Sequence, residues 1–269
     1  MTLLAGIIPG RILLKGDFEM SKGYAIVTGA SRGMGKAIFL ELAKEGYDLL
    51  GVYTSKGSAS KMQDLIGQVT EENGVKAFSF QADVGKADDC KALVDYAQKT
   101  LGRDISVLIN NAGIDSVCSF KDENLESIAH TVNVDLMGPM NLCCLVLPYM
   151  IERKGGDIIN MSSSAPLMGL AGDCSYNAAK YGLVGFSKTL AKEVGQYNIK
   201  VNCIAPGVMN TSMTANAAPA EQTDLIVKTI PMGCMGDPEE IPLCVSYILK
   251  SAYLTGQTIA VNGGLVSIP

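Results

Sequence analysis

Tyr176 and Lys180 lie one helical turn apart at the start of a stretch with apolar helical periodicity. Residues four apart share one face of a helix, so the phenol and the ammonium are predicted to point into the same space. A tyrosine has a pKa of about 10 and is a poor acid or base at neutral pH until a nearby cation stabilises its phenolate. Lys180 can supply that cation. The pair therefore predicts proton transfer to or from an oxygen atom of a bound substrate.

Ser163 lies thirteen residues before Tyr176 (176 − 163) and follows a predicted strand at residues 157–161. Its hydroxyl is suited to hold a substrate oxygen beside the phenol. A tyrosine and a lysine at this spacing occur by chance in many helices, so the pair alone is weakly specific. It becomes highly specific because a glycine-rich turn and a strand-end Asn-Asn-Ala-Gly precede it in the chain.

The glycine-rich turn joins the first predicted strand to the first predicted helix and reads Thr28-Gly29-Ala30-Ser31-Arg32-Gly33-Met34-Gly35. Its spacing is TGxxxGxG rather than the GxGxxG of many dinucleotide folds, but the physics is shared. Glycine permits a tight turn and lets backbone N–H groups approach a pyrophosphate at the positive end of a helix. The turn predicts a dinucleotide site at Gly29, Ser31, Arg32, Gly33, Met34 and Gly35; a purely structural turn is the alternative.

Two further strand ends agree with a dinucleotide. Asp83-Val84 ends the third predicted strand, where a carboxylate can accept a hydrogen bond from an adenine amino group. The fourth ends in small residues that let the backbone meet a cofactor, and it supplies the candidates Asn110, Ala112 and Gly113. Because such folds bind ligands at the carboxyl edge of the sheet, these residues are expected to line one site.

The stretch after the second predicted strand bears on which dinucleotide is bound. Enzymes that use NAD usually place an acid about 20 residues past the glycines, on the ribose 2′-hydroxyl. Here the chain reads Tyr53-Thr54-Ser55-Lys56, with no acid before Asp64. Hydroxyls of Thr54 and Ser55, with Lys56 and Arg32 as cations, suit a 2′-phosphate. The sequence favours NADP(H), and NAD(H) stays open.

Alternating elements must position these residues. Continuous apolar strands are predicted at residues 24–28, 48–53, 75–81, 105–109, 157–161, 199–205 and 258–261. Helical patterns between them cover residues 36–45, 60–72, 86–101, 136–153, 176–197 and 239–249. Buried strands separated by helices indicate a parallel sheet covered on both faces. The prediction is a single-domain α/β, Rossmann-type three-layer sandwich with about seven parallel strands.

Composition bounds the class of protein. The chain has 269 residues, 48% of them hydrophobic, and a formal net charge of −5, which argues against a nucleic-acid partner. No uninterrupted apolar stretch reaches the roughly 18 residues that a membrane-spanning helix needs, so no membrane segment is expected. The eight cysteines show no spacing typical of a metal site, and a reduced, cytoplasmic setting fits them.

Residues 1–19 are predicted to be an N-terminal extension that is not native, with translation starting at Met20. Codons for Lys15-Gly16-Asp17 can contain a purine-rich ribosome site at a plausible distance from Met20. The alternative is a loosely docked N-terminal arm, and the catalytic domain is expected to span residues 20–269.

From Tyr24 to Gly264 the chain resembles the short-chain dehydrogenase/reductase family, on the TGxxxGxG turn, the Asn-Asn-Ala-Gly strand end, Ser163 and the Tyr176–Lys180 pair. The resemblance implies that Tyr176 is the general acid/base, that Lys180 also binds the nicotinamide ribose, and that Ser163 polarises the substrate carbonyl. It further implies cofactor contacts from Pro206, Gly207, Val208 and Thr211. Residues 258–264 resemble a strand that the family uses in tetramer contacts, so a homotetramer is expected.

One departure from the family concerns its usual asparagine in a "vNLxG" stretch, which steadies a water in the proton relay from the lysine. Aligning this chain on Leu136 and Gly138 places Asp135, not Asn133, at that position. An ionised Asp135 would favour the charged Lys180 and oppose the Tyr176 phenolate. The sequence predicts a working relay with a shifted pH profile, and a different helix register is the alternative.

The substrate pocket is expected from Ile114-Asp115, residues 167–174 and a lid at residues 209–235, with Leu167, Met168 and Met209 as contacts. This apolar lining predicts a ketone or secondary alcohol on a bulky apolar substrate. In pattern the chain is closest to 3-oxoacyl-(acyl-carrier-protein) reductases and bacterial hydroxysteroid dehydrogenases. Residues 114–117 and 193–197 lack the arginines expected for an acidic carrier protein, which weakens the first class and favours a hydroxysteroid or other alcohol dehydrogenase, and both classes stay open. The alternative from another functional class is an NADP-binding sensor without turnover.

Overall fold

The structure is a computed structural model, and it describes residues 22–102, 104–115, 117–217 and 220–267. The predicted extension at residues 1–19 and the start at Met20 lie outside the described residues.

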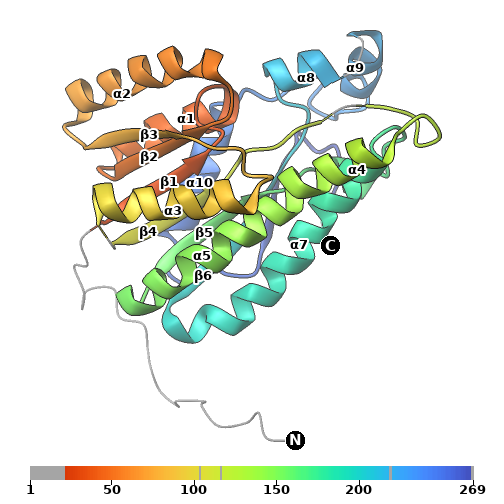
Figure 1. Cartoon of the computed structure of the whole chain (residues 1–269). Helices are drawn as coiled ribbons and strands as arrows, with labels where there is room; N and C mark the ends of the chain where they lie inside the picture. Colours follow the sequence, from red (N-terminus) through yellow and green to blue (C-terminus); the bar gives the residue numbers. More distant parts are fainter. Residues whose placement is uncertain (1–21, 103, 116, 218–219, 268–269) are drawn as a thin grey trace, which may run out of the picture.

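A seven-stranded sheet forms the centre of the molecule, in the order β3-β2-β1-β4-β5-β6-β7, and each neighbouring pair is parallel (Figure 1). The strands are β1 (Tyr24–Thr28), β2 (Asp48–Tyr53), β3 (Ala77–Gln81), β4 (Ile105–Asn110), β5 (Gly156–Met161), β6 (Ile199–Pro206) and β7 (Thr258–Val261). All residues of β1 and β4 are buried, as expected for central strands covered on both faces.

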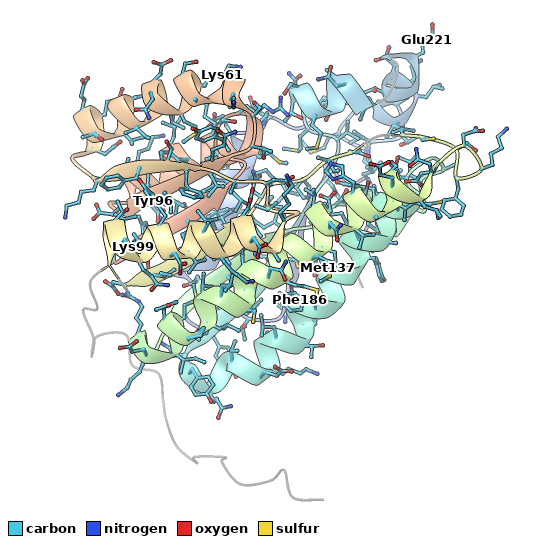
Figure 2. The ribbon with its side chains drawn as sticks, viewed as in Figure 1. Lys61, Tyr96, Lys99, Met137, Phe186 and Glu221 are labelled. Atoms are coloured by element: carbon cyan, nitrogen blue, oxygen red, sulfur yellow. The ribbon has the colours of Figure 1, made fainter. Side chains whose placement is uncertain are left out.

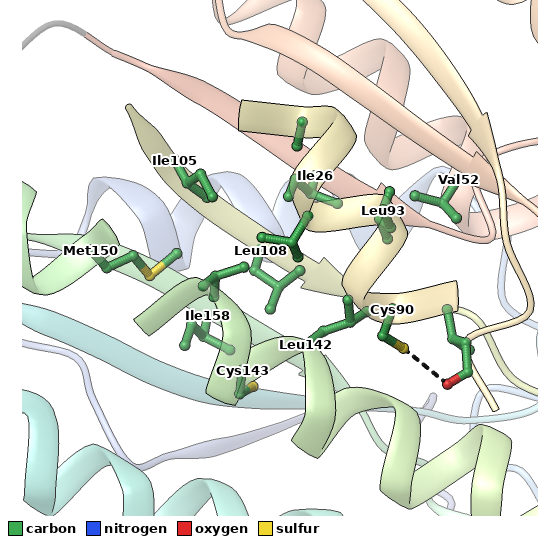
Figure 3. Close-up of a cluster of buried hydrophobic side chains, with 14 of the residues drawn as sticks. Ile26, Val52, Cys90, Leu93, Ile105, Leu108, Leu142, Cys143, Met150 and Ile158 are labelled. Atoms are coloured by element: carbon green, nitrogen blue, oxygen red, sulfur yellow. Dashed lines mark hydrogen bonds between the residues drawn. The ribbon is translucent and has the colours of Figure 1, made fainter. Parts of the chain in front are cut away.

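Helices cover the two faces of the sheet. One layer contains α1 (Gly33–Lys44), α2 (Ala59–Asn73) and α10 (Glu240–Lys250); the other contains α3 (Ala87–Leu101), α5 (Gly138–Arg153) and α7 (Cys174–Val194). Each layer has its own buried cluster. Figure 3 shows the second, where Leu93, Leu142 and Met150 pack on the sheet residues Ile26, Leu108 and Ile158. The predicted three-layer α/β sandwich is confirmed.

Helices α2 and α3 turn charged side chains toward solvent. Lys61 on α2 and Lys99 on α3 point outward, whereas Tyr96 on α3 turns toward the sheet and packs against Phe80 of β3 (Figure 2). This alternation along α3 is the amphipathic pattern on which the helix prediction rested.

The prediction that the fourth long helix begins at Leu136 is wrong. The helical path begins with α4 (Leu125–Val132), passes through one π-helical turn, η2 (Asn133–Met137), and continues as α5. Asn124 caps its start by accepting from the backbone N–H of Ser127 at 2.8 Å. This earlier start leaves no clear apolar periodicity, because the first turns of α4 are partly exposed and interrupted by polar residues.

By length and composition, the combined stretch Leu125–Arg153 is apolar enough to cross a membrane, and 44% of its most apolar window is buried in the protein. Its side chains Leu142, Cys143, Val146 and Met150 pack into the cluster of Figure 3. The apolar character of this helix is therefore explained by its place in the core.

Short helices complete the chain between the main elements. They are η1 (Lys56–Ser58), α6 (Ala165–Met168), η3 (Gly195–Tyr197), α8 (Ser212–Ala217) and α9 (Ala220–Val227). The last two lie in the predicted lid, at the same end of the sheet as α4 (Figure 1).

Candidate active site

The glycine turn and the end of β4 are joined by a set of hydrogen bonds. The Thr28 hydroxyl oxygen accepts from the backbone N–H groups of Asn111 and Ala112, both at 2.9 Å. The Asn111 amide donates back to the carbonyl oxygens of Thr28 at 2.9 Å and Gly29 at 3.3 Å. Thr28 and Asn111 were not predicted as site residues, although both lie inside the motifs. Their hydrogen bonds hold the ends of β1 and β4 together.

Glycine is required at two positions of the turn. Gly29 has φ +66°, which L side chains rarely adopt, and a Cβ on Gly35 would lie 2.2 Å from the Gly29 carbonyl oxygen. The turn therefore packs tightly against the first turn of α1, which contains no acidic residue. Backbone N–H groups at this helix start can donate hydrogen bonds to an anionic pyrophosphate, as predicted for Gly29, Ser31, Gly33, Met34 and Gly35.

The segment after β6 extends to this same turn. A Cβ on Gly33 would lie 3.5 Å from the Thr211 methyl group, so residue 211 closes on the glycine turn. Gly207 is held by its N–H bond to the Val261 carbonyl at 2.9 Å, and Thr214 donates to the Met209 carbonyl at 2.6 Å. The structure thus brings the predicted stretch Pro206, Gly207, Val208 and Thr211 to the edge where the turn lies.

The residues predicted to contact a 2′-phosphate lie beside the turn. Thr54, Ser55 and Lys56 are exposed directly beyond β2, and Arg32 is exposed just before α1. A backbone hydrogen bond from Ala30 to Val52, at 3.0 Å, joins the two segments. Two cations and two hydroxyls therefore border one exposed surface.

The other two predicted strand ends differ from each other. Asp83 accepts from the Gly85 N–H at 3.0 Å and pairs with Lys86 at 3.6 Å, at the sheet edge next to buried Val84. The Asn110 side chain instead turns into the core, where it donates to Asn160 Oδ1 at 2.8 Å. This contact leaves the Asn110 backbone, with that of Ala112 and Gly113, for the cofactor, as the sequence predicts.

Lys180 and Tyr176 share one face of α7, as their spacing predicted. The Lys180 ammonium lies 5.7 Å from the centre of the Tyr176 ring and donates to the Met161 carbonyl at 2.9 Å. Ser163 follows β5, accepts from the Ala165 N–H at 3.1 Å, and hydrogen-bonds the Tyr176 side chain. Phenol, ammonium and hydroxyl thus converge at the carboxyl edge of the sheet.

Asp135 also reaches this cluster, from the π-helical turn η2. Its Oδ1 lies 3.1 Å from Lys180 Nζ, and its carboxylate accepts from the Ile114 N–H at 3.3 Å. The side chain is fully buried, and a Cβ on Gly113 would approach Oδ1 to 2.6 Å. The register that aligns Leu136 and Gly138 therefore agrees with the geometry. π-Helical turns are frequent at functional sites.

Some neighbouring groups oppose the effect of burial on the pKa values of Tyr176 and Asp135. Burial raises the pKa of Tyr176 above its ordinary value, the charges of Asp135 and Asp115 raise it further, and the hydrogen bond with Ser163 lowers it. Burial also raises the pKa of the Asp135 carboxyl, against the attraction of Lys180, which lowers it. The protein therefore holds Tyr176 as a phenol, ready to donate a proton.

Replacing Asp135 with asparagine is expected to lower the pKa of Tyr176, because one charge that opposes its phenolate is removed. In alcohol oxidation the phenolate is the active form, so the acidic limb of kcat/KM is expected to move to lower pH by about 0.5 to 1 unit. Asp157→Asn is a matched control, because Asp157 pairs with Lys200 at 3.0 Å in another buried acid–lysine pair. An unchanged limb in Asp135→Asn, or a shift to higher pH, would contradict this role.

The predicted substrate contacts are not all brought together. Leu167 and Met168 are half-buried in α6, just beyond Ser163. Met209 is only 4% exposed and belongs to the core cluster of the α1 layer. Its contact with a substrate stays a prediction. The burial of Met209 comes from a strand-like bridge to Gly236, where Met209 packs into the space that a side chain at 236 would occupy. Met232 and Met235 remain exposed.

Comparisons with known proteins identify the family of this chain. A sequence profile described as short chain dehydrogenase matches residues 23–222. The 3-oxoacyl-(acyl-carrier-protein) reductase FabG of Staphylococcus epidermidis is 36% identical over 246 residues, covering 90% of this chain and 98% of the relative. The enzyme of the same name from Pseudomonas aeruginosa is 38% identical over 246 residues, with 90% and 96% covered.

A solved structure supports the same relationship. A blue fluorescent protein from a metagenomic library, solved in complex with NADPH, is 31% identical, with a TM-score of 0.85 and coverage of 91% of this chain and 98% of that one. With the profile and the relatives, the predicted resemblance is confirmed: the chain belongs to the short chain dehydrogenase family.

Proposed function

We propose that this protein is an NADP(H)-dependent oxidoreductase that interconverts a ketone and a secondary alcohol on a bulky apolar substrate. The observation that carries the proposal is the convergence of Ser163, Tyr176 and Lys180 at the sheet edge where the glycine turn lies. An acid, a cation that stabilises its conjugate base, and a hydroxyl that orients the reacting oxygen are the groups that carbonyl reduction needs.

The residues present fit a nicotinamide dinucleotide. Gly29 and Gly35 let the turn pack directly on Asn111 and on its own backbone. Among the described residues a Cβ on Gly33 would meet only Thr211, at 3.5 Å, so backbone N–H groups at the start of α1 are open to a phosphate. Gly29, Ser31, Gly33, Met34 and Gly35 would hold the pyrophosphate. Asp83, Val84, Ala112, Gly113 and the segment from Pro206 to Thr211 would line the rest. When bound, the nicotinamide supplies or accepts the hydride.

The protein side of the reaction follows from the geometry. In reduction, the Ser163 hydroxyl and the Tyr176 phenol hold the carbonyl oxygen, and Tyr176 donates its proton as negative charge develops there. Lys180 stabilises the resulting phenolate, and Asp135 keeps the ammonium charged and oriented. In oxidation the same groups act in reverse, with the phenolate as the base.

Preference for NADP(H) is supported by the four residues beside the turn and by the similar protein solved with NADPH. Arg32→Ala combined with Lys56→Ala is expected to raise KM for NADPH about 10- to 100-fold, because two phosphate contacts of an exposed site are lost. KM for NADH should change little. Lys61→Ala, an exposed lysine on α2, is the control. Equal losses with both cofactors would contradict a 2′-phosphate site.

Two substrate classes are in keeping with the site: 3-oxoacyl thioesters, from the identity of the reductase relatives, and hydroxysteroids, from the apolar half-buried Leu167 and Met168. We include a homotetramer and a cytoplasmic setting in the proposal. Assays with acetoacetyl thioester, hydroxysteroids and simple ketones, each with NADPH and NADH, test it. Cofactor binding without turnover across this panel would favour an NADP-binding sensor instead.

A further inference from the structure

A group of hydrogen-bond acceptors lies beside Tyr176 and plays no part in the chemistry described above. Asp173 stands one turn before Tyr176, is only 4% exposed, and forms no side-chain capping bond with α7. Its Oδ1 is buried without a hydrogen-bond partner among the described residues. A buried carboxylate oxygen without a hydrogen-bond donor destabilises the folded protein unless a ligand supplies the donor.

Asn177 adds a second acceptor of the same kind. Its Nδ2 donates to the Leu170 carbonyl at 3.3 Å, which fixes the orientation of the amide. Its Oδ1 is then left as an acceptor, and that atom is buried with no partner among the described residues. Asp173 and Asn177 are four residues apart and share one face of α7, so both acceptors lie along the helix start that carries Tyr176.

A second carboxylate is brought close by a neighbouring loop. The Cys118 N–H donates to the Gly172 carbonyl at 2.8 Å, and a Cβ on Gly172 would meet the Val117 side chain at 2.7 Å. This contact docks the Asp115 loop against the segment that ends at Asp173. Burial, and then the Asp115 charge, raise the pKa of Asp173 to about 7, and both carboxylates oppose the Tyr176 phenolate.

The lysine of the site does not compensate this charge. Lys180 is engaged by Asp135 at 3.1 Å and by the Met161 carbonyl at 2.9 Å. The subsite therefore offers buried acceptors and negative charge, and the complementary ligand group is a cation with several donors. A carboxylate there would face like charges.

We propose that the substrate carries a protonated amine, which binds to Asp173 and Asn177 while its ketone or alcohol oxygen meets Tyr176 and Ser163. The inference rests on the proposed hydride-transfer function and names the substrate class of that site. It points to a substrate outside the two unsubstituted classes above, because neither a simple acyl thioester nor a steroid nucleus supplies this cation.

Four ring ketones that differ at one position provide the test. They carry an ammonium group (4-aminocyclohexanone), a methyl group of the same size (4-methylcyclohexanone), a hydroxyl (4-hydroxycyclohexanone) and a carboxylate (4-oxocyclohexanecarboxylate). Near pH 8 Asp173 is largely ionised and the amine is still protonated. With NADPH, kcat/KM is expected to be about 10- to 100-fold higher for the ammonium ketone than for the methyl ketone.

Asp173→Asn should reduce this ratio to less than about threefold, since a neutral amide removes the charge but keeps the shape. Both ketones are measured in the same variant, so a general loss of activity cancels in the ratio. NADPH binding checks that the variant is folded. Asp122→Asn is the matched control, because Asp122 is an exposed acid in the loop that also carries Asp115. Its ratio should equal that of the unmodified protein.

Binding to the enzyme–NADP⁺ complex, measured by calorimetry, separates this inference from the proposed function. Tighter binding of the ammonium ketone that is lost in Asp173→Asn supports the subsite, even if the enzyme shows no turnover. Absence of turnover would count only against the proposed hydride transfer. Equal binding and kcat/KM for the ammonium and methyl ketones would overturn the inference. A hydroxyl ketone as good as the ammonium ketone, or a ratio unchanged in Asp173→Asn, would overturn it too.

Discussion

Replacing Tyr176 with phenylalanine is expected to lower kcat/KM for ketone reduction by about 10²- to 10⁴-fold, the usual contribution of a positioned general acid. The change removes one oxygen atom and leaves the ring that packs beside Lys180, at 5.7 Å from its ammonium. The Kd for NADPH should therefore change by less than about threefold, since the phenol is expected to act on the transition state and not on cofactor binding.

The measurement is steady-state reduction with NADPH, with cofactor binding followed by fluorescence. Tyr197→Phe is the matched control, because Tyr197 is a 40% exposed tyrosine just beyond the end of α7. Retention of more than about a tenth of the activity in Tyr176→Phe would show that another group donates the proton.

Lys180→Met is expected to destabilise the folded protein by about 3 to 5 kcal/mol, besides abolishing the stabilisation of the phenolate. The reason is that the substitution removes the ion-pair partner of Asp135, which is fully buried and lies 3.1 Å from Lys180. An ionised carboxylate there would lose that partner. In this variant the folded state would favour the protonated acid, so stability should fall as pH rises above the ordinary range of an aspartate.

Urea unfolding of the double variant Asp135→Asn, Lys180→Met isolates this effect. It should be about 1 to 3 kcal/mol more stable than Lys180→Met alone, because the unpaired acid has been removed, yet it should remain inactive. Strict additivity of the two single changes would mean that the ion pair contributes nothing to folding. Rescue of activity would mean that Lys180 acts only through Asp135.

The sequence predicts most of the fold because strand and helix periodicities are local signals, and each predicted strand of the sheet is present. The chemistry of α7 was equally accessible, since the spacing of Tyr176 and Lys180 alone places them on one face. The register of Asp135 could be read from Leu136 and Gly138, but its bond to Lys180 depends on the π-helical turn η2, which leaves no periodic pattern.

The direction of some individual side chains could not be predicted. The bond from Asn110 to Asn160 on the neighbouring strand and the packing of Met209 beside Gly236 both depend on residues far away in the chain, so neither could be predicted from the sequence. The acceptors on Asp173 and Asn177 were missed for a related reason. Being buried without a donor is a property of the folded surroundings, so it has no counterpart in composition or spacing.

The order of the strands also has a consequence for how the protein is made. β1 lies between β2 and β4, so the cofactor edge is incomplete until residue 110 has left the ribosome, and β5, β6 and β7 are then added one by one to a single open edge. Between these steps a nascent chain presents a buried-type apolar strand with unpaired backbone groups. Premature termination before β7 would therefore yield an aggregation-prone fragment rather than a weaker enzyme.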